Sequence, residues 1–546
     1  MGTSRSKARH AAGASRRRPA RSAPGPRAGH DGPVSGVRPI RRVLIANRGE
    51  IALRVLRACR EMGISPVAVY SEIDRDTLPV RLADAAYCIG PAQSSASYLD
   101  IEAILRAARQ AGADALHPGY GFLAENPGLA RACESAGLVF IGPPPEAMRM
   151  VGDKVEARRL MQKSGVPVIP GLLERAADAA AIAAFARTTG YPVILKAAAG
   201  GGGKGMRVAR SETDLDAAVR GARSEARSAF GDDGIYAEKL MENVRHVEIQ
   251  ILADHHGHAV HLGERECSVQ RRHQKLVEEA PSVALRPADR DRMGALALEV
   301  ARVCGYRNAG TVEFLLDGKG RPYFMEVNAR IQVEHPVTEM VTGCDLVRAQ
   351  IEIARGEPLR IRQDRLQPHG WAIECRVLAE DPENGFRPSP GRIAALRLPA
   401  GPGIRVDTAL QPGDEIPLHY DALIAKLIAW GRDRSEALAR MRRALDEFLV
   451  AGIRTTLPFH RELLLDPDFV AGRLDIGFVD RVMPRLETAM REVGPDAELA
   501  AIAAAIHATE EAQRRTPAEP ARGPGAWVTA GRQAQMESGL LRRPPV

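Results

Sequence analysis

The stretch Met325–Glu339, MEVNARIQVEHPVTE, is dense with side chains that can handle a small anion and a proton. Arg330 can grip a planar, carboxylate-like anion through two parallel hydrogen bonds. Glu334 is a candidate general base, because a carboxylate can accept a proton from a bound substrate. This segment therefore predicts the catalytic part of an enzyme site.

The start of the same stretch forms one arm of a predicted β-hairpin. Gly310–Phe314 and Tyr323–Asn328 have the pattern of two strands joined by a turn. Glu313 and Glu326 would face each other, with Asn328 nearby, and such oxygen ligands suit Mg²⁺ or Mn²⁺ bridging nucleotide phosphates. A solvated hairpin with ordinary acidic residues is the alternative interpretation.

A glycine-rich loop follows another predicted strand. Val193–Lys196 ends in a lysine and leads into Ala199–Met206, AGGGGKGM. Backbone N–H groups of such a loop can approach phosphate oxygens without interference from Cβ atoms, although a flexible turn is the simpler alternative. The loop is not a P-loop, because Gly205 follows Lys204, and no GxGxxG stands behind the first strand.

The segment Gln270–Lys275, QRRHQK, is a further polar cluster, with three charges and a histidine in six residues. Taken alone, a run of this kind usually forms a solvated face.

The N-terminal part of the folded chain alternates strands and helices. Val43–Ala46, Val67–Tyr70 and Leu138–Ile141 read as short buried strands, and Ile51–Met62 and Ile101–Ala111 as helices. This alternation predicts a doubly wound α/β domain with ligands at the carboxyl ends of its strands.

Composition narrows the class of protein further. The 546 residues carry a formal net charge of +8, but residues 1–42 hold eleven Lys or Arg against Asp31, so the rest of the chain is near −2. A body of that charge does not predict a nucleic-acid-binding surface. The seven cysteines form no CxxC pair, which fits a reducing cytoplasm, and no apolar run is long enough to predict a membrane span or a secretory signal.

The first 39 residues predict a disordered basic tail, because they contain no aromatic residue and too little apolar surface to repay ordering. Four interpretations of this tail remain open: a start codon assigned too far upstream, an organelle transit peptide, a nucleic-acid-binding tail, and an inert tail. The lack of aromatic residues for base stacking weakens the nucleic-acid interpretation.

Together these segments resemble the biotin carboxylase family of ATP-grasp enzymes, in order, from about Arg41 to Asp480. The residues that carry the resemblance are IANRGEIALRVLRA, HPGYGFLAEN, GDK, ILKAAAGGGGKGM, HVEIQILAD, CSVQRRHQKLVEEAP, EFLL, FMEVNARIQVEHPVTEMVTG, ECRVLAEDP and PSPGR. It covers about four-fifths of the chain, and the ordered set is far more specific than any single motif.

The resemblance implies a role for each matching position. The residues implied to bind ATP are Lys154 and Lys196 at the phosphates, Gly202 and Gly203 in the closing loop, Glu238, Lys239, Leu240 and Met241 at the adenine, and His246 near the ribose. The implied metal ligands are Glu313, Glu326 and Asn328. The implied bicarbonate pocket comprises Lys275, Arg330, Gln332 and Val333, with Glu334 as the base. Arg376 is implied to face the biotin ureido group, and Gln270, His273 and Tyr120 to border the same space.

The resemblance also implies a fold of three α/β lobes. The expected boundaries are a tail at 1–39, a doubly wound N-terminal domain at 40–152, an ATP-grasp domain at 153–366 with a mobile lid at about 170–240, a C-terminal domain at 367–482, and a helical, proline-containing extension at 483–546. Lys204 departs slightly from the family pattern, since many members have arginine there.

The expected activity is carboxylation of biotin from ATP and bicarbonate through carboxyphosphate, as the first half-reaction of an acetyl-CoA or related acyl-CoA carboxylase in fatty acid biosynthesis. No Met-Lys-Met biotin-attachment motif occurs, so the expected partners are a biotin carboxyl carrier protein and carboxyltransferase subunits, with the chain itself a homodimer in the cytoplasm. No membrane or nucleic-acid partner is expected. The alternatives are another ATP-grasp ligase, such as a purine carboxylase or a carbamoyl-phosphate synthase domain, and a silent scaffold that binds a carrier protein.

Overall fold

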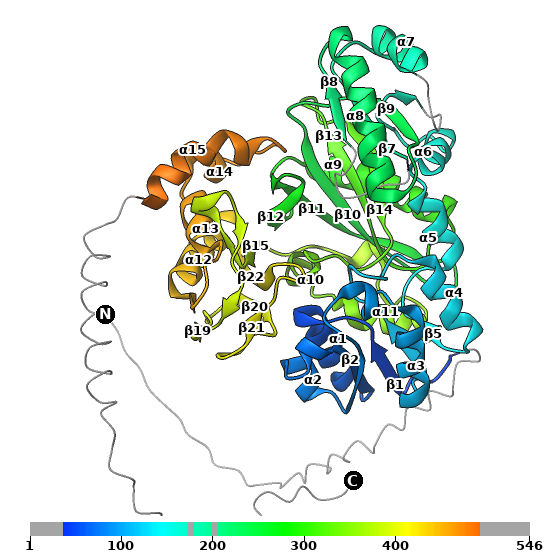
Figure 1. The fold of residues 1–546 in the computed structure, drawn as a ribbon, viewed down its shortest axis with the longest axis vertical. Coiled ribbons are helices and arrows are strands. Elements are labelled where there is room, and N and C mark those ends of the chain that lie inside the picture. The colour runs from blue at the N-terminus through cyan, green and yellow to red at the C-terminus, as the bar shows by residue number, and fades with distance from the viewer. Residues whose placement is uncertain (1–36, 173–178, 199–205, 492–546) are drawn as a thin grey trace, which may run out of the picture.

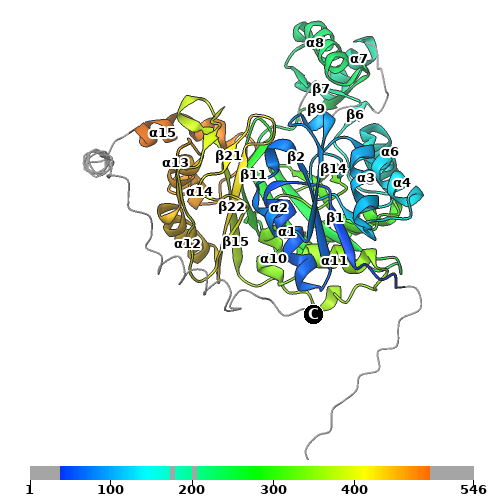
Figure 2. The same cartoon turned by 60° about the horizontal axis from the view of Figure 1, so that its bottom comes forward.

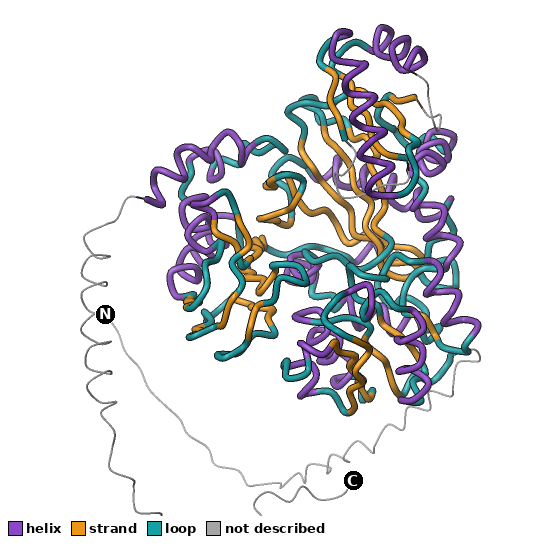
Figure 3. Tube along the Cα trace, viewed as in Figure 1, coloured by secondary structure: helices purple, strands orange, loops and turns teal. Residues whose placement is uncertain are grey.

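The computed structural model describes residues 37–172, 179–198 and 206–491 (Figure 1). Three main sheets organise this part of the chain: a parallel N-terminal sheet, a long central sheet, and a small sheet in a separate lobe. Figure 3 shows the strands of these sheets lying inside, with most helices on their outer faces. The mixed α/β fold of three lobes confirms the expected fold class.

The N-terminal sheet is parallel throughout and has the strand order β3-β2-β1-β4-β5. Its strands are β3 (Ala85–Gly90), β2 (Ser65–Ser71), β1 (Arg42–Ile45), β4 (Ala115–His117) and β5 (Val139–Phe140). Its helices are α1 (Gly49–Glu61), α2 (Leu78–Leu82), α3 (Ile101–Ala111) and α4 (Pro127–Ser135). The order reverses direction between β1 and β4, and ligands of doubly wound sheets bind at such a switch point.

Both faces of β1 are buried, which explains its unbroken apolar sequence. Val43 and Ile45 pack with α1, while Leu44 packs with α3 and α4 on the other face. Helix α11 (Leu346–Ala354) joins the α1 side, although it lies more than 200 residues later in the chain. The N-terminal lobe is therefore fixed to the central sheet through a shared apolar core.

The central sheet is antiparallel and has eight strands in the order β14-β13-β10-β11-β12-β15-β22-β20. The strands are β10 (Arg245–Ala253), β11 (Ala259–Arg271), β12 (Gln274–Ala280), β13 (Asn308–Leu316), β14 (Pro322–Asn328), β15 (Trp371–Leu378), β20 (Ile404–Thr408) and β22 (Leu423–Gly431). The predicted hairpin is confirmed, because β13 pairs with β14 and places Glu313 opposite Glu326. The sheet runs across the expected boundary at 366, which stays a prediction.

Different helices cover the two ends of this sheet. α5 (Pro145–Gly152), α6 (Lys154–Lys163) and α9 (Pro287–Val303) pack against β10, β13 and β14. α12 (Arg434–Glu447), α13 (Leu457–Leu463), α14 (Pro467–Val470) and α15 (Phe478–Arg491) build the core beside β15 and β22. α10 (His335–Thr342) packs on the opposite face of β15 and β22.

The third sheet belongs to a lobe that stands apart from the rest in Figure 2. Its strand order is β6 (Gly171–Leu172), β9 (Ile235–Lys239), β7 (Val193–Ala197) and β8 (Arg207–Ala209). Helices α7 (Ala179–Thr189) and α8 (Glu212–Phe230) cover it and share a hydrophobic core with it alone. This lobe corresponds to the expected lid, whose mobility stays a prediction.

The remaining elements are short. They are β16 (Glu380–Asp381), β17 (Arg387–Pro388), β18 (Gly391–Arg392), β19 (Ala395–Arg397), β21 (Glu415–Ile416), β23 (Leu449–Ala451), and the 3₁₀ turns η1 (Glu72–Asp74), η2 (Ser94–Ala96), η3 (Gln363–Arg365) and η4 (Pro382–Asn384). The predicted tail at 1–39, apart from its last three residues, and most of the extension at 483–546 lie outside the described residues. Helix α15 continues past the expected boundary at 482 to Arg491. In the described part of the chain, no helix has the length and apolarity required to cross a bilayer.

Candidate active site

The expected site residues line one cavity of about 590 Å³ between the small lobe and the central sheet. Those that line it are Lys154, Lys196, Glu238, Lys239, Leu240, Met241, His246, Gln270, His273, Lys275, Glu313, Glu326, Asn328, Arg330, Gln332, Val333, Glu334 and Arg376. Tyr120 lines an adjoining cavity of about 350 Å³, together with Arg330, Val333 and Arg376. Gly202 and Gly203 lie outside the described residues. The fold brings the other expected side chains together around these two cavities. The roles implied for the individual residues stay predictions.

The small-lobe end of the cavity is lined by lysines suited to a polyphosphate. Lys196 on β7 has its Nζ 2.8 Å from a carboxylate oxygen of Glu238 on β9. Lys154, at the start of α6, has its Nζ 2.7 Å from Glu326. Lys239 instead donates to the backbone carbonyls of Gly190 and Tyr191 at 3.0 and 2.9 Å, which shows that its ammonium holds the lobe's own backbone.

A buried arginine that the sequence motifs do not single out, Arg158 on α6, lies in the same end of the cavity. Its guanidinium forms an ion pair with Glu238 and lies 5.6 Å from the Tyr236 ring. Burial, helped by the positive charges of Arg158 and Lys154, lowers the pKa of Lys196 to about 7. The phosphate end therefore brings Lys154, Arg158 and Lys196 together, and the charge of Lys196 depends on pH near neutrality.

The facing carboxylates of β13 and β14 were expected to hold a divalent cation. Glu313 Oε1 accepts from Lys275 at 3.0 Å and from Asn328 at 2.8 Å, while Glu326 pairs with Lys154. His246, at the start of β10, contacts the second Glu313 oxygen at 3.1 Å. Burial opposes ionisation of Glu313, but Lys275 and His246 together outweigh it and hold its pKa well below the usual value. Carboxylate oxygens with an adjacent amide oxygen fit Mg²⁺, which prefers hard oxygen ligands.

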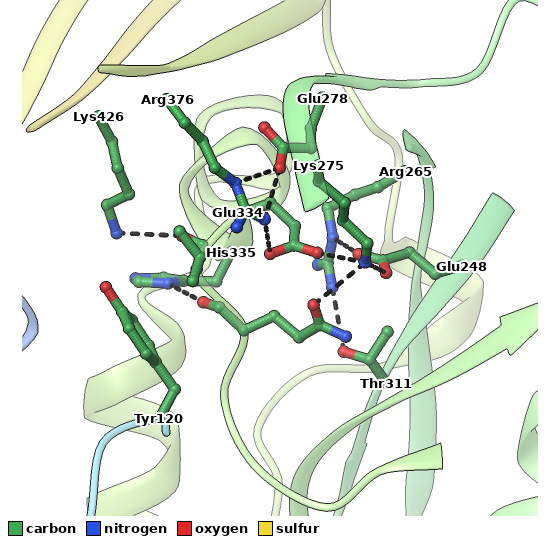
Figure 4. A network of polar contacts seen from close by, with 12 residues as sticks. Tyr120, Glu248, Arg265, Lys275, Glu278, Thr311, Glu334, His335, Arg376 and Lys426 are labelled. Carbon is green, nitrogen blue, oxygen red and sulfur yellow. Dashed lines mark hydrogen bonds and ion pairs between the residues drawn. The ribbon is translucent and has the colours of Figure 1, made fainter. Parts of the chain in front are cut away.

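Lys275 lies at the centre of the polar network in Figure 4. Its Nζ donates to Glu248 at 2.6 Å, to Glu334 at 2.6 Å and to Glu313 at 3.0 Å. Such charge-assisted bonds are stronger than neutral ones, and together they fix the ammonium between strands β10, β12 and β13. Arg265 on β11 backs the network by pairing with Glu248.

Arg376 on β15 reaches the same network from the other side. Its guanidinium donates to Glu278 on β12 at 2.6 Å and to Glu334 at 2.9 Å. Glu334 is thus held between Lys275 and Arg376, fully buried, where α10 begins. Burial alone would raise the pKa of Glu334, but Lys275 and Arg376 outweigh it and lower the pKa, so the carboxylate is ionised and can accept a proton.

The arginine of the anion-gripping segment, Arg330, is oriented by its own neighbours. Its Nε donates to Glu125 at 3.0 Å and one terminal nitrogen donates to Asn328 at 2.9 Å. Glu125 also accepts from the backbone N–H of Ala329 at 2.8 Å. These contacts hold Arg330 beside Gln332, whose amide oxygen lies 3.4 Å from the Lys275 ammonium.

Two further expected residues lie on or next to the β11–β12 turn. Gln270 pairs with Lys275 in the strand register, and His273 occupies the turn with a φ of 66°. Arg272 beside it has a φ of 49°. Two consecutive non-glycine residues in the left-handed region are costly, and such backbone strain clusters at functional sites.

Sequence reasoning missed Glu248, Arg265 and Glu278, which complete the buried network. A signal for Glu248 existed, because HVEIQILAD alternates polar and apolar residues over a strand whose apolar side is fully buried. An ionisable residue on the other face of such a strand requires a charged partner. No local pattern identifies that partner as Lys275, which comes from a different strand.

Comparisons with known proteins agree with this geometry. Residues 39–148 match the family described as "Biotin carboxylase, N-terminal domain", residues 374–481 the "Biotin carboxylase C-terminal domain", and residues 153–362 the "Carbamoyl-phosphate synthase L chain, ATP binding domain". Biotin carboxylase 1 of Bacillus subtilis is 52% identical over 445 residues, which cover 81% of this chain and 98% of that protein. One subunit of the pyruvate carboxylase of Methanothermobacter thermautotrophicus is 51% identical, covering 83% of this chain and 92% of that protein.

Solved structures show the same similarity. The biotin carboxylase domain dimer of Hydrogenobacter thermophilus 2-oxoglutarate carboxylase, in complex with MgADP, ADP and bicarbonate, has a TM-score of 0.80 and 47% identity, covering 82% of this chain and 98% of that one. A biotin carboxylase of Campylobacter jejuni in a β,γ-ATP complex has a TM-score of 0.79 and 48% identity, covering 81% and 99%. N-terminal, ATP-binding and C-terminal regions all match in order, and about half of the aligned residues are identical to those of curated relatives, so the chain belongs to the biotin carboxylase family of ATP-dependent ligases.

Proposed function

We propose that the chain uses ATP and bicarbonate to carboxylate biotin, and that it does so around Glu334. The single observation that carries the proposal is the position of this carboxylate. It lies buried and ionised between Lys275 and Arg376 in the cavity that also contains Lys154 and Lys196, and its partner Arg376 lines the adjoining cavity that contains Tyr120 as well. A base at this junction can serve chemistry that begins on a nucleotide and ends on a second substrate.

In the first step, Arg330 and Lys275 bind bicarbonate, and Glu334 takes its proton as the bicarbonate oxygen attacks the γ-phosphorus. The bond from that phosphorus to the leaving ADP oxygen breaks, and carboxyphosphate forms. Lys154 and Lys196 neutralise charge on the transferred group. Glu313, Glu326 and Asn328 would hold Mg²⁺, which supplies further charge neutralisation at the phosphates when bound.

In the second step, carboxyphosphate separates into CO₂ and phosphate, and phosphate removes the proton from the ureido nitrogen of biotin. That nitrogen then attacks CO₂. Arg376 lines both cavities and would stabilise the negative charge that develops on the ureido oxygen. Because Arg376 already pairs with Glu278 and Glu334, its orientation is set before substrate arrives.

The assembly is also a proposal. We infer that biotin arrives on a separate carrier protein, because the sequence lacks a Met-Lys-Met motif. We also infer that the chain works with carboxyltransferase subunits and is located in the cytoplasm. We infer further that it forms a homodimer, like the relative from Hydrogenobacter. Relatives include one component of a pyruvate carboxylase and one domain of a 2-oxoglutarate carboxylase, so the half-reaction is compatible with several final acceptors besides an acyl-CoA.

The test measures two activities of the purified chain. ATP cleavage should require bicarbonate, and labelled bicarbonate should appear in carboxybiotin when free biotin or a biotinylated carrier is added. ATP cleavage without fixation of label under either condition would contradict the proposal. A streptavidin blot should show no band at the mass of the chain, and a band there would refute the separate carrier.

A further inference from the structure

One buried ammonium contacts all three regions that the family comparisons distinguish. Lys426 lies on β22 with its side chain fully buried. Figure 4 shows this side chain on the Tyr120 side of the polar network. Its Nζ donates to the carbonyl oxygen of Val333 at 3.0 Å and lies 3.1 Å from Glu50 and 3.8 Å from Asp407. Glu50 belongs to α1 of the N-terminal lobe, and Val333 directly precedes the proposed base.

A cation at this position depends on nearby carboxylates. Burial opposes the charge of Lys426, but Glu50, Asp407 and Glu374 outweigh it and raise the pKa of the lysine. Lys426 stands directly opposite Arg376 in the register of β15 and β22, and like charges placed opposite each other on neighbouring strands repel. The other face of the same strands is apolar, and an apolar residue would avoid both the repulsion and the desolvation of the ammonium. A lysine here therefore calls for a reason beyond packing.

The contact with Val333 supplies that reason. Three consecutive carbonyls of the catalytic segment each accept a hydrogen bond from a side chain. The Ile331 carbonyl accepts from Arg330 at 3.2 Å and the Gln332 carbonyl from His335 at 2.7 Å, so both donors lie within the segment. The Val333 carbonyl accepts from Lys426, which lies on a strand 93 residues away.

Fixing the Val333 carbonyl fixes the peptide plane that joins Val333 to Glu334. Rotation of this plane would change the direction in which the Glu334 side chain leaves the backbone. Glu334 must stay within hydrogen-bond reach of bicarbonate to accept its proton. The Lys426 ammonium therefore controls a geometric requirement of the reaction without facing the substrate.

We propose that Lys426 is a positioning residue, which aims Glu334 by holding the Val333 carbonyl, and that Glu50 is the buried counter-charge that makes this ammonium tolerable. The inference rests on the proposed function. Glu50 is suited to this part because it also accepts a hydrogen bond from Tyr120, whose ring lies 5.9 Å from the Lys426 ammonium. Through these two contacts the N-terminal lobe stabilises the charge that orients the base.

The test must separate positioning from simple stability, because Lys426→Met also leaves Glu50 buried without its partner. The double variant Lys426→Met/Glu50→Gln removes both charges together and keeps an acceptor for Tyr120. We expect Lys426→Met to lower the melting temperature and the double variant to recover most of it. In the single and the double variant alike, kcat for bicarbonate-dependent ATP cleavage should stay about a hundredfold below wild type, because a small misplacement of a catalytic group causes a loss of that size. The KM for ATP should remain within about twofold, because Lys154 and Lys196 are untouched.

Arg434→Met is the matched control. Arg434 forms a buried ion pair with Glu279 at 2.7 Å on the apolar-face side of the same sheet and does not touch the catalytic segment. This variant should lose stability but keep its kcat.

The inference is overturned if the double variant regains kcat together with its melting temperature. It is overturned equally if Lys426→Met turns over at the wild-type rate. Should Lys426→Met fail to fold, the double variant decides alone, through the same comparison. Wild-type protein that cleaves no ATP with bicarbonate would instead refute the proposed function, so the two failures are distinguishable.

Discussion

Replacing Glu334 with glutamine should abolish turnover while leaving the protein folded and able to bind nucleotide. The substitution keeps the shape of the side chain, removes its charge and basicity, and replaces one acceptor oxygen with an N–H donor. Each cation beside it retains another carboxylate, since Lys275 keeps Glu248 and Arg376 keeps Glu278. No cation loses all of its carboxylates, but the glutamine amide oxygen can accept from only one of Lys275 and Arg376, so the free energy of unfolding should fall by about 1.5 to 3 kcal/mol.

The loss of transition-state stabilisation should exceed the loss of folding stability. A positioned general base contributes roughly a hundred- to ten-thousandfold, which corresponds to about 3 to 5 kcal/mol of activation free energy. Bicarbonate-dependent ATP cleavage measures this loss, and calorimetric titration with a non-hydrolysable ATP analogue measures nucleotide affinity. Glu279→Gln is the control, because Glu279 neighbours Glu278 in sequence but pairs with Arg434. Near-normal turnover of Glu334→Gln would refute Glu334 as the base.

Three further predictions concern charge at other positions. Arg376→Ala should retain bicarbonate-dependent ATP cleavage within about tenfold, while carboxybiotin formation should fall roughly a hundred- to a thousandfold. Equal losses in both assays would instead place Arg376 in the formation of carboxyphosphate. Burial lowers the pKa of Lys196 to about 7, so this lysine should lose its charge, and ATP affinity measured by calorimetry should weaken, as the pH rises from 6 to 9. Lys196→Arg should flatten that profile. A flat wild-type profile would contradict the prediction. Burial also lowers the pKa of His117 to about 4, so the unfolded chain takes up a proton that the folded chain refuses, and up to about 3 kcal/mol of stability should be lost as the pH falls from about 6.5 to 4. His117→Gln should reduce this slope in urea denaturation, and an unchanged slope would show that His117 does not cause it.

The sequence predicted several local elements correctly, and most of the residues that it implied for the site line the same two cavities. Helix α3 has its expected bounds, and the β13–β14 hairpin has the expected pairing of Glu313 with Glu326. Both depend on periodicity or turn signals within about 20 residues, which a sequence pattern records directly. Strand β5 is shorter than expected, at Val139–Phe140.

The contacts between distant strands could not be predicted in the same way. The role implied for Arg376, facing the biotin ureido group, says nothing of its protein partners, yet its guanidinium binds Glu278 and the proposed base Glu334. These three residues lie on different elements, and their contact depends on the order and register of the central sheet. Neither order nor register is encoded by the composition of one strand, so Lys426 also gave no functional signal in the sequence.

The central sheet has a consequence for where the polypeptide can be divided. Strand β12 pairs with β11 on one side and with β15 on the other, so the ATP-binding and C-terminal regions are one continuous β-structure. A fragment ending near residue 366 would expose the whole edge of β12, and unpaired edges of that kind promote aggregation. The small lobe, in contrast, has a core of its own. A gene fusion or split-protein design should therefore place its break at that lobe and keep the two larger regions on a single piece.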